Sequence, residues 1–215
     1  MEDTPQNDET TDNVPHKKQI TLPLDDEQIA DLRAGEWISL SGVMYLMNWQ
    51  ASQRLMDDIN AGVELPFDIS EELIFFAVTT PAPWGKVIGS TGPEYTEHYL
   101  EPALHFLDVG ARGIVGRGPI PEQLFTTLKK SRGLYFVTPS TASALLARRV
   151  IQSEFIAYPD LGLDAIRKIK VANFPAIVVV DAFGRNAFHK KTPPPPSTIE
   201  IIEDESYIDS ESNEE

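Results

Sequence analysis

The sequence contains no cysteine and only four histidines among its 215 residues. Without cysteine the chain can form no disulfide, perform no thiol catalysis and hold no iron–sulfur cluster by itself. No two of the histidines have the spacing of a zinc site, so we expect this chain to bind no metal of its own. A metal that matters for its function must then come from a partner.

Long apolar runs are also missing from the sequence. The longest, residues 73–78 and 176–180, have the length of strands. A membrane-spanning helix needs roughly 18 apolar residues or more. The first residues are acidic and lack the apolar core of a secretory signal. We therefore expect a cytoplasmic protein that does not cross a membrane.

Basic residues are scarce relative to acidic ones, and the net charge is −15. Thirteen of the 33 acids lie in residues 1–14 and 200–215, where there is no Lys or Arg. The rest of the chain carries 20 acids against 18 Lys and Arg, a balance of −2. Phosphate binding requires clustered cations, so this nearly neutral body argues against a nucleic-acid partner.

The composition divides the chain into three parts. Residues 1–18 form an acidic arm with almost nothing to bury, for which we predict disorder. Residues 192–215 begin with a run of prolines and continue with acids and isoleucines. We interpret this tail as a disordered, solvated end rather than as a peptide ligand for a partner. Residues 19–191 have the size of a single domain.

Strand and helix patterns alternate in this domain, which indicates an α/β fold. Asp25 and Gln28 have the spacing of a capping box, and Asn48 can cap a helix that ends at Gly62. Besides that helix we expect helices at 25–33, around 103–107, from Pro121 and at 141–150. The expected strands are 37–40, 73–78, 113–115, 134–137, 154–158 and 176–180.

Loops that connect these elements are the candidate places for chemistry. The first spans residues 41–49 and leads into a helix N-terminus, where exposed amides favour an anion. The second, residues 88–98, is rich in glycine. The third, residues 115–119, places Arg117 between two glycines, and an arginine can bind a carboxylate with two hydrogen bonds. A fourth turn, residues 138–141, also presents a helix N-terminus.

The order of these segments is more specific than any one of them. It resembles the β component of class I, iron–sulfur-dependent fumarases and L-tartrate dehydratases, which is also the C-terminal domain of the fused enzymes. The resemblance covers about residues 20–187. The matching segments are residues 22–37, 40–42, 65–68, 80–83, 88–93, 116–118, 144–147, 158–162, 165–166 and 174–184.

This resemblance implies a swivelling β/β/α domain that closes over a partner. In that family an α-type partner carries the cysteines of a 4Fe-4S cluster, which agrees with their absence here. The cluster iron acts as the Lewis acid that removes or adds the hydroxyl group. The β component binds the small dicarboxylate and helps to move the proton.

The resemblance also assigns roles to individual residues. Glu94 stands at a threonine associated with proton transfer and His98 at an arginine, so these two are the candidate catalytic residues. Arg117 replaces a lysine of the family and keeps its charge. The predicted substrate-binding residues are Arg117, Asn48, Gly92, Gly116 and Gly118.

Two positions depart further from the family pattern. Asn48 stands where the family has an arginine, and Ser52 where it has a histidine. With His98 also replacing an arginine, two cations of a dicarboxylate pocket are changed, and each charge-assisted pair contributes a few kcal/mol to binding.

Two hypotheses therefore remain open. The first is a hydro-lyase component with an altered site, in which Asn48, Glu94, His98 and Arg117 converge on one cleft. The second is a degenerate, non-catalytic β-like protein that serves as a binding or regulatory subunit. In that case the four residues scatter, or Trp49 and Tyr95 fill the space between them.

Overall fold

The computed structural model describes residues 17–65 and 67–189 of the chain. Strands and helices alternate along it, so the predicted α/β fold is confirmed. The arm predicted for residues 1–18 and the tail predicted for residues 192–215 lie outside the described residues, except for Lys17 and Lys18. Lys18 is the first residue of a strand.

The chain forms eight strands and five α-helices over the described residues. The strands are β1 (Lys18–Thr21), β2 (Trp37–Met47), β3 (Leu73–Thr79), β4 (Thr91–Pro93), β5 (Gly113–Gly116), β6 (Leu134–Val137), β7 (Val150–Ala157) and β8 (Ile166–Val180). The helices are α1 (Asp26–Asp31), α2 (Trp49–Asn60), α3 (Leu100–Asp108), α4 (Glu122–Ser131) and α5 (Ser143–Ala147).

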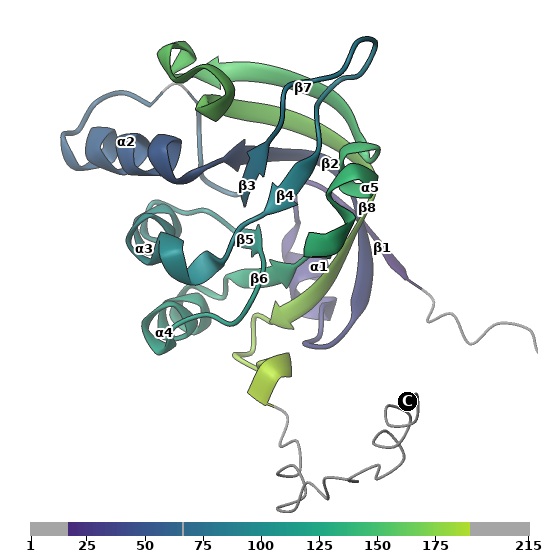
Figure 1. Cartoon of the computed structure of the whole chain (residues 1–215). Coiled ribbons are helices and arrows are strands. Elements are labelled where there is room, and N and C mark those ends of the chain that lie inside the picture. The colour runs from purple at the N-terminus through teal and green to yellow at the C-terminus, as the bar shows by residue number, and fades with distance from the viewer. Residues whose placement is uncertain (1–16, 66, 190–215) are drawn as a thin grey trace, which may run out of the picture.

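The strands form one sheet with the order β1-β2-β3-β5-β6-β8-β7, and β4 pairs with β3 beside this path. Neighbours from β1 to β6 along the path are parallel, whereas β8 is antiparallel to β2, β6 and β7. Because β8 pairs with both β6 and β2, the strands β2-β3-β5-β6-β8 close into a ring (Figure 1). Closure removes the open edges that these strands would otherwise present.

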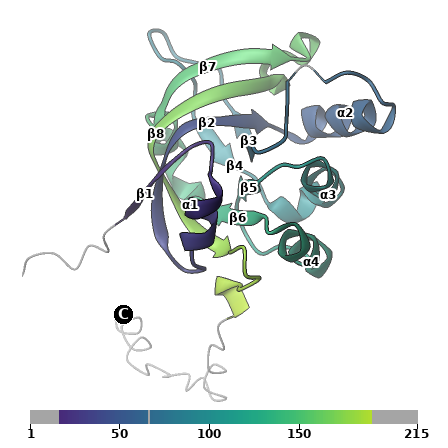
Figure 2. The ribbon, with the colours of Figure 1, turned by 180° about the vertical axis from the view of Figure 1, so that it is seen from behind.

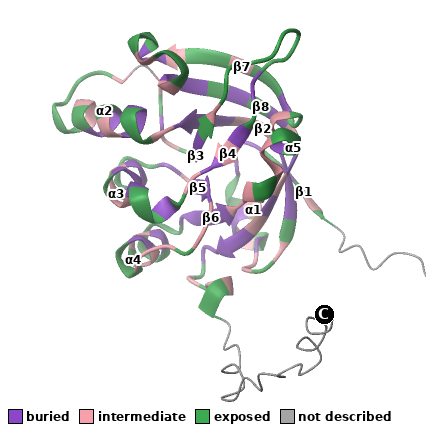
Figure 3. Ribbon diagram, in the orientation of Figure 1, coloured by how far each residue is buried: buried purple, intermediate pink, exposed green. Residues whose placement is uncertain are grey.

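Many residues of the strands are buried (Figure 3), and they belong to two clusters, one on each face of the strands. Successive residues of a strand point to opposite faces, so Phe75 belongs to one cluster and Phe76 to the other. The first cluster takes side chains from every strand of the ring and from α1 and α5. The second lies under α2, α3 and α4, which line one side of the molecule (Figures 1 and 2).

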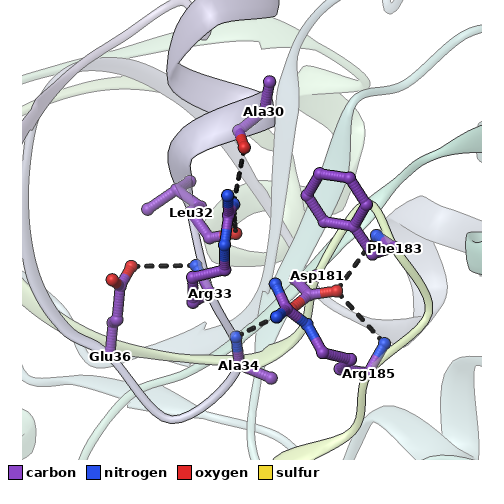
Figure 4. A network of polar contacts seen from close by, with 8 residues as sticks. All are labelled: Ala30, Leu32, Arg33, Ala34, Glu36, Asp181, Phe183 and Arg185. Atoms are coloured by element: carbon purple, nitrogen blue, oxygen red, sulfur yellow. Dashed lines mark hydrogen bonds and ion pairs between the residues drawn. The ribbon is translucent and has the colours of Figure 1, made fainter.

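Buried Asp181 ties the chain after β8 to the turn that follows α1 (Figure 4). Its carboxylate accepts hydrogen bonds from the backbone amides of Ala34 (2.9 Å), Phe183 (3.0 Å) and Arg185 (3.1 Å), and from Arg185 Nε (2.6 Å). Burial by itself raises the pKa of this carboxyl group, but these four bonds outweigh burial, and the pKa of Asp181 is lowered. The connection is thus held by an ionised side chain.

The strand expected at residues 37–40 is longer than predicted. It continues through Ser41 and Gly42 to Met47, with a bulge at Gly42 in its pairing with β8. Gly42 has φ +133°, and a Cβ there would lie 2.5 Å from the carbonyl oxygen of Leu22, so only glycine fits this approach. The prediction of a loop at residues 41–49 is therefore wrong, because most of these residues belong to β2.

The helix expected at residues 141–150, by contrast, is shorter than predicted. Only α5 is α-helical, and Val150 already pairs with Val171 as the first residue of β7. Strand β8 extends the predicted strand 176–180 backwards to Ile166. The short strands β1 and β4 were not expected from the sequence. No helix in the described part of the chain is long and apolar enough to cross a membrane.

Candidate functional site

The segments that carry Glu94 and Arg117 lie side by side at the carboxyl end of β5, next to the middle of β3. The Glu94 amide donates to the carbonyl oxygen of Phe76 (3.0 Å), and the Arg117 amide donates to that of Glu94 (3.1 Å). The amide of Thr96 in turn donates to the carbonyl of Arg117 (3.2 Å). These backbone bonds place two of the predicted site residues next to each other. In α/β sheets, ligands usually bind at the carboxyl ends of the parallel strands, and β5 ends here.

Two of the predicted glycines are required by close packing at this point. A Cβ at Gly116 would clash with the hydroxyl of Thr96. Gly118 has φ +77°, and its Cβ would lie 2.7 Å from the ring of Tyr95. Side chains at either position would push residues 94–96 away from Arg117. Gly92, in β4, pairs with Val78 and precedes this segment by two residues.

Arg117 is a half-buried cation without a carboxylate partner among the described residues. Its guanidinium lies over the Tyr95 ring at 3.9 Å from the ring centroid. The Nε atom is buried and has no hydrogen-bond acceptor within the described part of the chain. The backbone next to Glu94 holds the residue, but the Glu94 carboxylate does not pair with it. A guanidinium without an internal acceptor is chemically able to bind a carboxylate.

Glu94 instead accepts a hydrogen bond from the hydroxyl of Tyr99. Tyr99 is 1% exposed and lies between the rings of Phe76 (centroids 4.2 Å apart) and Trp49 (5.6 Å). Burial raises the pKa of Tyr99, and the bond to Glu94 raises it further, so the phenol stays protonated as the donor. Tyr99 was not identified from the sequence, although it directly follows the loop predicted at residues 88–98.

Asn48 acts as the N-cap of α2, as its position before that helix predicted. Its Oδ1 accepts from the Ala51 amide (3.1 Å), so this oxygen is used within the helix. Ser52 is fully buried and donates to the Asn48 carbonyl (2.6 Å). Asn48 is joined to the rest of the site only through the next residue, Trp49, which packs against Tyr99.

His98 lies apart from the other predicted residues. Its side chain is 69% exposed, its ring centroid is 6.0 Å from that of Tyr95, and its Nε2 is 3.9 Å from a carboxylate oxygen of Glu97. The structure thus brings together Glu94, Arg117, Gly92, Gly116 and Gly118. Asn48 is connected to them through Trp49 and Tyr99, whose rings are in contact. The His98 side chain is exposed to solvent. Both aromatic residues suspected of filling the site, Trp49 and Tyr95, do contact its members.

A separate cavity of about 400 Å³ lies between residues 83–90 and the region of α5. Its lining includes Lys86 and Arg148, and none of the seven predicted site residues lines it. No three His, Asp or Glu side chains within the described ranges are arranged to hold a metal ion.

Comparisons with known proteins agree with the pattern of segments. Residues 1–191 match the family described as Fumarase C-terminus. The anaerobic class I fumarate hydratase of Escherichia coli (strain K12) is 31% identical over 76% of this chain and 30% of its own length. Fumarate hydratase 1, mitochondrial, of Leishmania major is 30% identical over 71% of this chain and 28% of its own length.

The L(+)-tartrate dehydratase subunit beta of E. coli (strain K12) is 27% identical over 79% of this chain and 86% of its own length. The chain therefore spans about 30% of the fumarate hydratases that it matches, but most of the tartrate dehydratase subunit. Since the family match covers all but the last residues of the sequence, the chain belongs to the Fumarase C-terminus family.

Proposed function

We propose that this chain is the β-type component of an iron–sulfur-dependent hydro-lyase that acts on a small hydroxy- or unsaturated dicarboxylic acid. The observation that carries the proposal is the position of Arg117. Its guanidinium is held against Tyr95 and has no carboxylate partner among the described residues, and its backbone amide donates to the carbonyl of Glu94. A relative with a similar length, the L(+)-tartrate dehydratase subunit beta, supports the assignment to a separate subunit.

The 4Fe-4S cluster belongs to an α-type partner in this proposal, because a chain without cysteine offers no thiolate ligand. When bound, the cluster supplies Lewis-acid chemistry at the hydroxyl group. This chain swivels to close over the partner and contributes only its own side chains. Its role in the reaction belongs to Arg117, Glu94 and His98, with Tyr99 holding Glu94.

Arg117 binds one substrate carboxylate and stabilises the negative charge that develops on it when a proton leaves the neighbouring carbon. Glu94 accepts that proton in dehydration and returns it to the carbon in hydration. The Tyr99 hydroxyl fixes the carboxylate of Glu94 in place. His98 is exposed beside Tyr95, where closure over the partner brings it to the second carboxylate or to the departing group.

A second candidate function is a non-catalytic, regulatory β-like subunit. The specific observation in its favour is that Asn48 and Ser52 are used to cap and stabilise α2. Trp49 and Tyr95 also occupy space around the site. The two proposals share the fold and the partner and differ in turnover.

Anaerobic co-expression with the α-type, cluster-bearing chain of the same host tests the proposal. The purified complex is assayed with fumarate, mesaconate and tartrate. We expect turnover that falls at least a hundredfold in Arg117→Ala and is unchanged in Lys130→Ala, which removes an exposed cation from α4. A stable, cluster-loaded complex without turnover on any dicarboxylate supports the regulatory subunit instead, and the absence of a complex contradicts both.

A further inference from the structure

A second arginine, Arg167, is buried without a counter-ion in the described structure. It is the second residue of β8 and is 6% exposed. Its guanidinium lies over the Phe155 ring, 4.0 Å from the centroid. One nitrogen, Nη1, makes a long hydrogen bond of 3.4 Å to the Ser153 hydroxyl, and the buried Nε has no acceptor within the described ranges.

The edge of this guanidinium that has no acceptor is the one that binds carboxylates. The Nε and Nη2 hydrogens point in the same direction and form a fork that matches two carboxylate oxygens. Neither nitrogen of this edge has an acceptor among the residues that the structure describes. By contrast, Arg54, Arg112 and Arg185 each bind a carboxylate of the chain.

A buried, unpaired cation carries a large desolvation penalty. This penalty is visible in Arg167, because burial lowers its pKa. A cation that is stacked and buried but has no acceptor on its fork gains stability when an anion binds the fork. The side chain is thus arranged to receive a carboxylate rather than to stabilise the isolated fold.

The fold places Arg167 at the same end of the strand ring as the candidate site. It pairs with Leu46, two residues before Asn48 at the carboxyl end of β2. Strands β2 and β3 separate it from β5 and Arg117. Its guanidinium lies over β7, on the side away from β2. Arg167 and Arg117 therefore lie at two separate positions and do not share one pocket.

We propose that Arg167 is a second carboxylate-binding site, which takes the carboxylate of a small organic anion independently of Arg117. Phe155 forms the apolar wall of this site, Ser153 holds the other side of the guanidinium, and the Nε–Nη2 edge binds the ligand.

The test uses the full-length chain without any partner and follows the 1H–15N signal of Arg167 Nε, identified by its loss in Arg167→Met. Succinate is the probe, and sodium chloride at equal ionic strength is the control for screening. We expect succinate, and not chloride, to shift this signal in a saturable manner. The shift persists in Arg117→Ala, which removes the other cation.

Thermal unfolding gives a second measurement. Part of the rise in unfolding temperature caused by succinate is lost in Arg167→Met and retained in Arg149→Met, an exposed arginine without a partner among the described residues. Without succinate, Arg167→Met unfolds no earlier than the original chain, since it removes an unpaired buried charge.

Three results would overturn the proposal. The first is an Arg167 Nε signal that does not respond to succinate or responds equally to chloride. The second is a shift that disappears in Arg117→Ala, because the two positions would then be one site. The third is a signal that moves without added ligand when Glu200, Glu203 and Asp204 are replaced by amides, because the carboxylate would then be the chain's own. None of these results depends on hydro-lyase turnover.

Discussion

Tyr99 and Glu94 are joined by a partly buried hydrogen bond in the candidate site. Tyr99→Phe leaves the half-buried carboxylate without its donor while keeping the ring between Phe76 and Trp49. We expect the free energy of unfolding to fall by about 1–2 kcal/mol, as for other bonds to charged groups. Urea denaturation at pH 7 measures the change.

Tyr95→Phe is the matched control, because the Tyr95 hydroxyl makes no hydrogen bond to the described residues and its ring still supports Arg117. Equal losses in the two variants would show that the bond to Glu94 contributes nothing. In the double variant Tyr99→Phe/Glu94→Ala the cost should be smaller than the sum of the single costs.

Residues of the candidate site could be identified where a local sequence pattern marks them. Arg117, flanked by two glycines, was identified because that spacing is visible in the sequence, and the structure places it beside Glu94. Tyr99 was missed because its hydroxyl meets Glu94 only through the turn of a short 3₁₀ helix, Thr96–Tyr99. The use of Asn48 as a helix cap was expected from its position and is confirmed.

At the scale of elements, the network around Asp181 controls how α1 and β8 are joined. Asp181→Asn replaces a carboxylate that accepts four hydrogen bonds by an amide with a single acceptor oxygen. We expect a loss on the order of 3 kcal/mol at pH 7. Asp57→Asn, an exposed position on α2, should change stability little.

The same network predicts a dependence on pH. The pKa of Asp181 is lower in the fold than its ordinary value of 3.8, so the folded chain binds this proton less readily than the unfolded chain. The contribution is therefore complete above pH 3.8 and is lost as the pH falls further. The difference between the original chain and Asp181→Asn should shrink below this pH, and a constant difference down to pH 2 would contradict the assignment.

Elements with local signals were predicted correctly. The capping box at Asp25 and Gln28 is present, with both hydrogen bonds formed, and Asn48 caps α2. β1 and β4 have few residues and acquire their structure from pairing with β2 and β3, which no local pattern records. The helix over residues 141–150 was overestimated because Val150 pairs with β8, and tertiary pairing outweighs helix propensity.

At the scale of the molecule, both buried clusters share one set of strands and should unfold together. Ile169→Val shortens a fully buried side chain of the first cluster, and Ile114→Val one of the second. Each should cost about 0.5–1.5 kcal/mol. The exposed Ile151→Val serves as the control and should cost less.

Near-UV circular dichroism and amide exchange measure these effects on both sides of the sheet. In each variant we expect all probes to shift to the same new midpoint. If Ile114→Val weakened only the helix-covered side, the two clusters would be separate cooperative units.

The α/β class could be predicted from the alternation of strand and helix patterns. The ring could not be predicted, because the pairing of β2 with β8 joins segments that are more than a hundred residues apart.

The closure of the ring by β8 also sets the order of events during synthesis. A ribosome delivers β2 early and β8 last, so the first strands wait with one side unpaired until almost the whole domain has emerged. Contacts between such distant segments form slowly, because a long loop must close first. A nascent chain that stops before residue 166 would expose the apolar faces of β2, β3, β5 and β6, the four parallel strands of the ring. The synthesis of β8 thus closes the ring and also ends the time during which the nascent chain is most prone to aggregate.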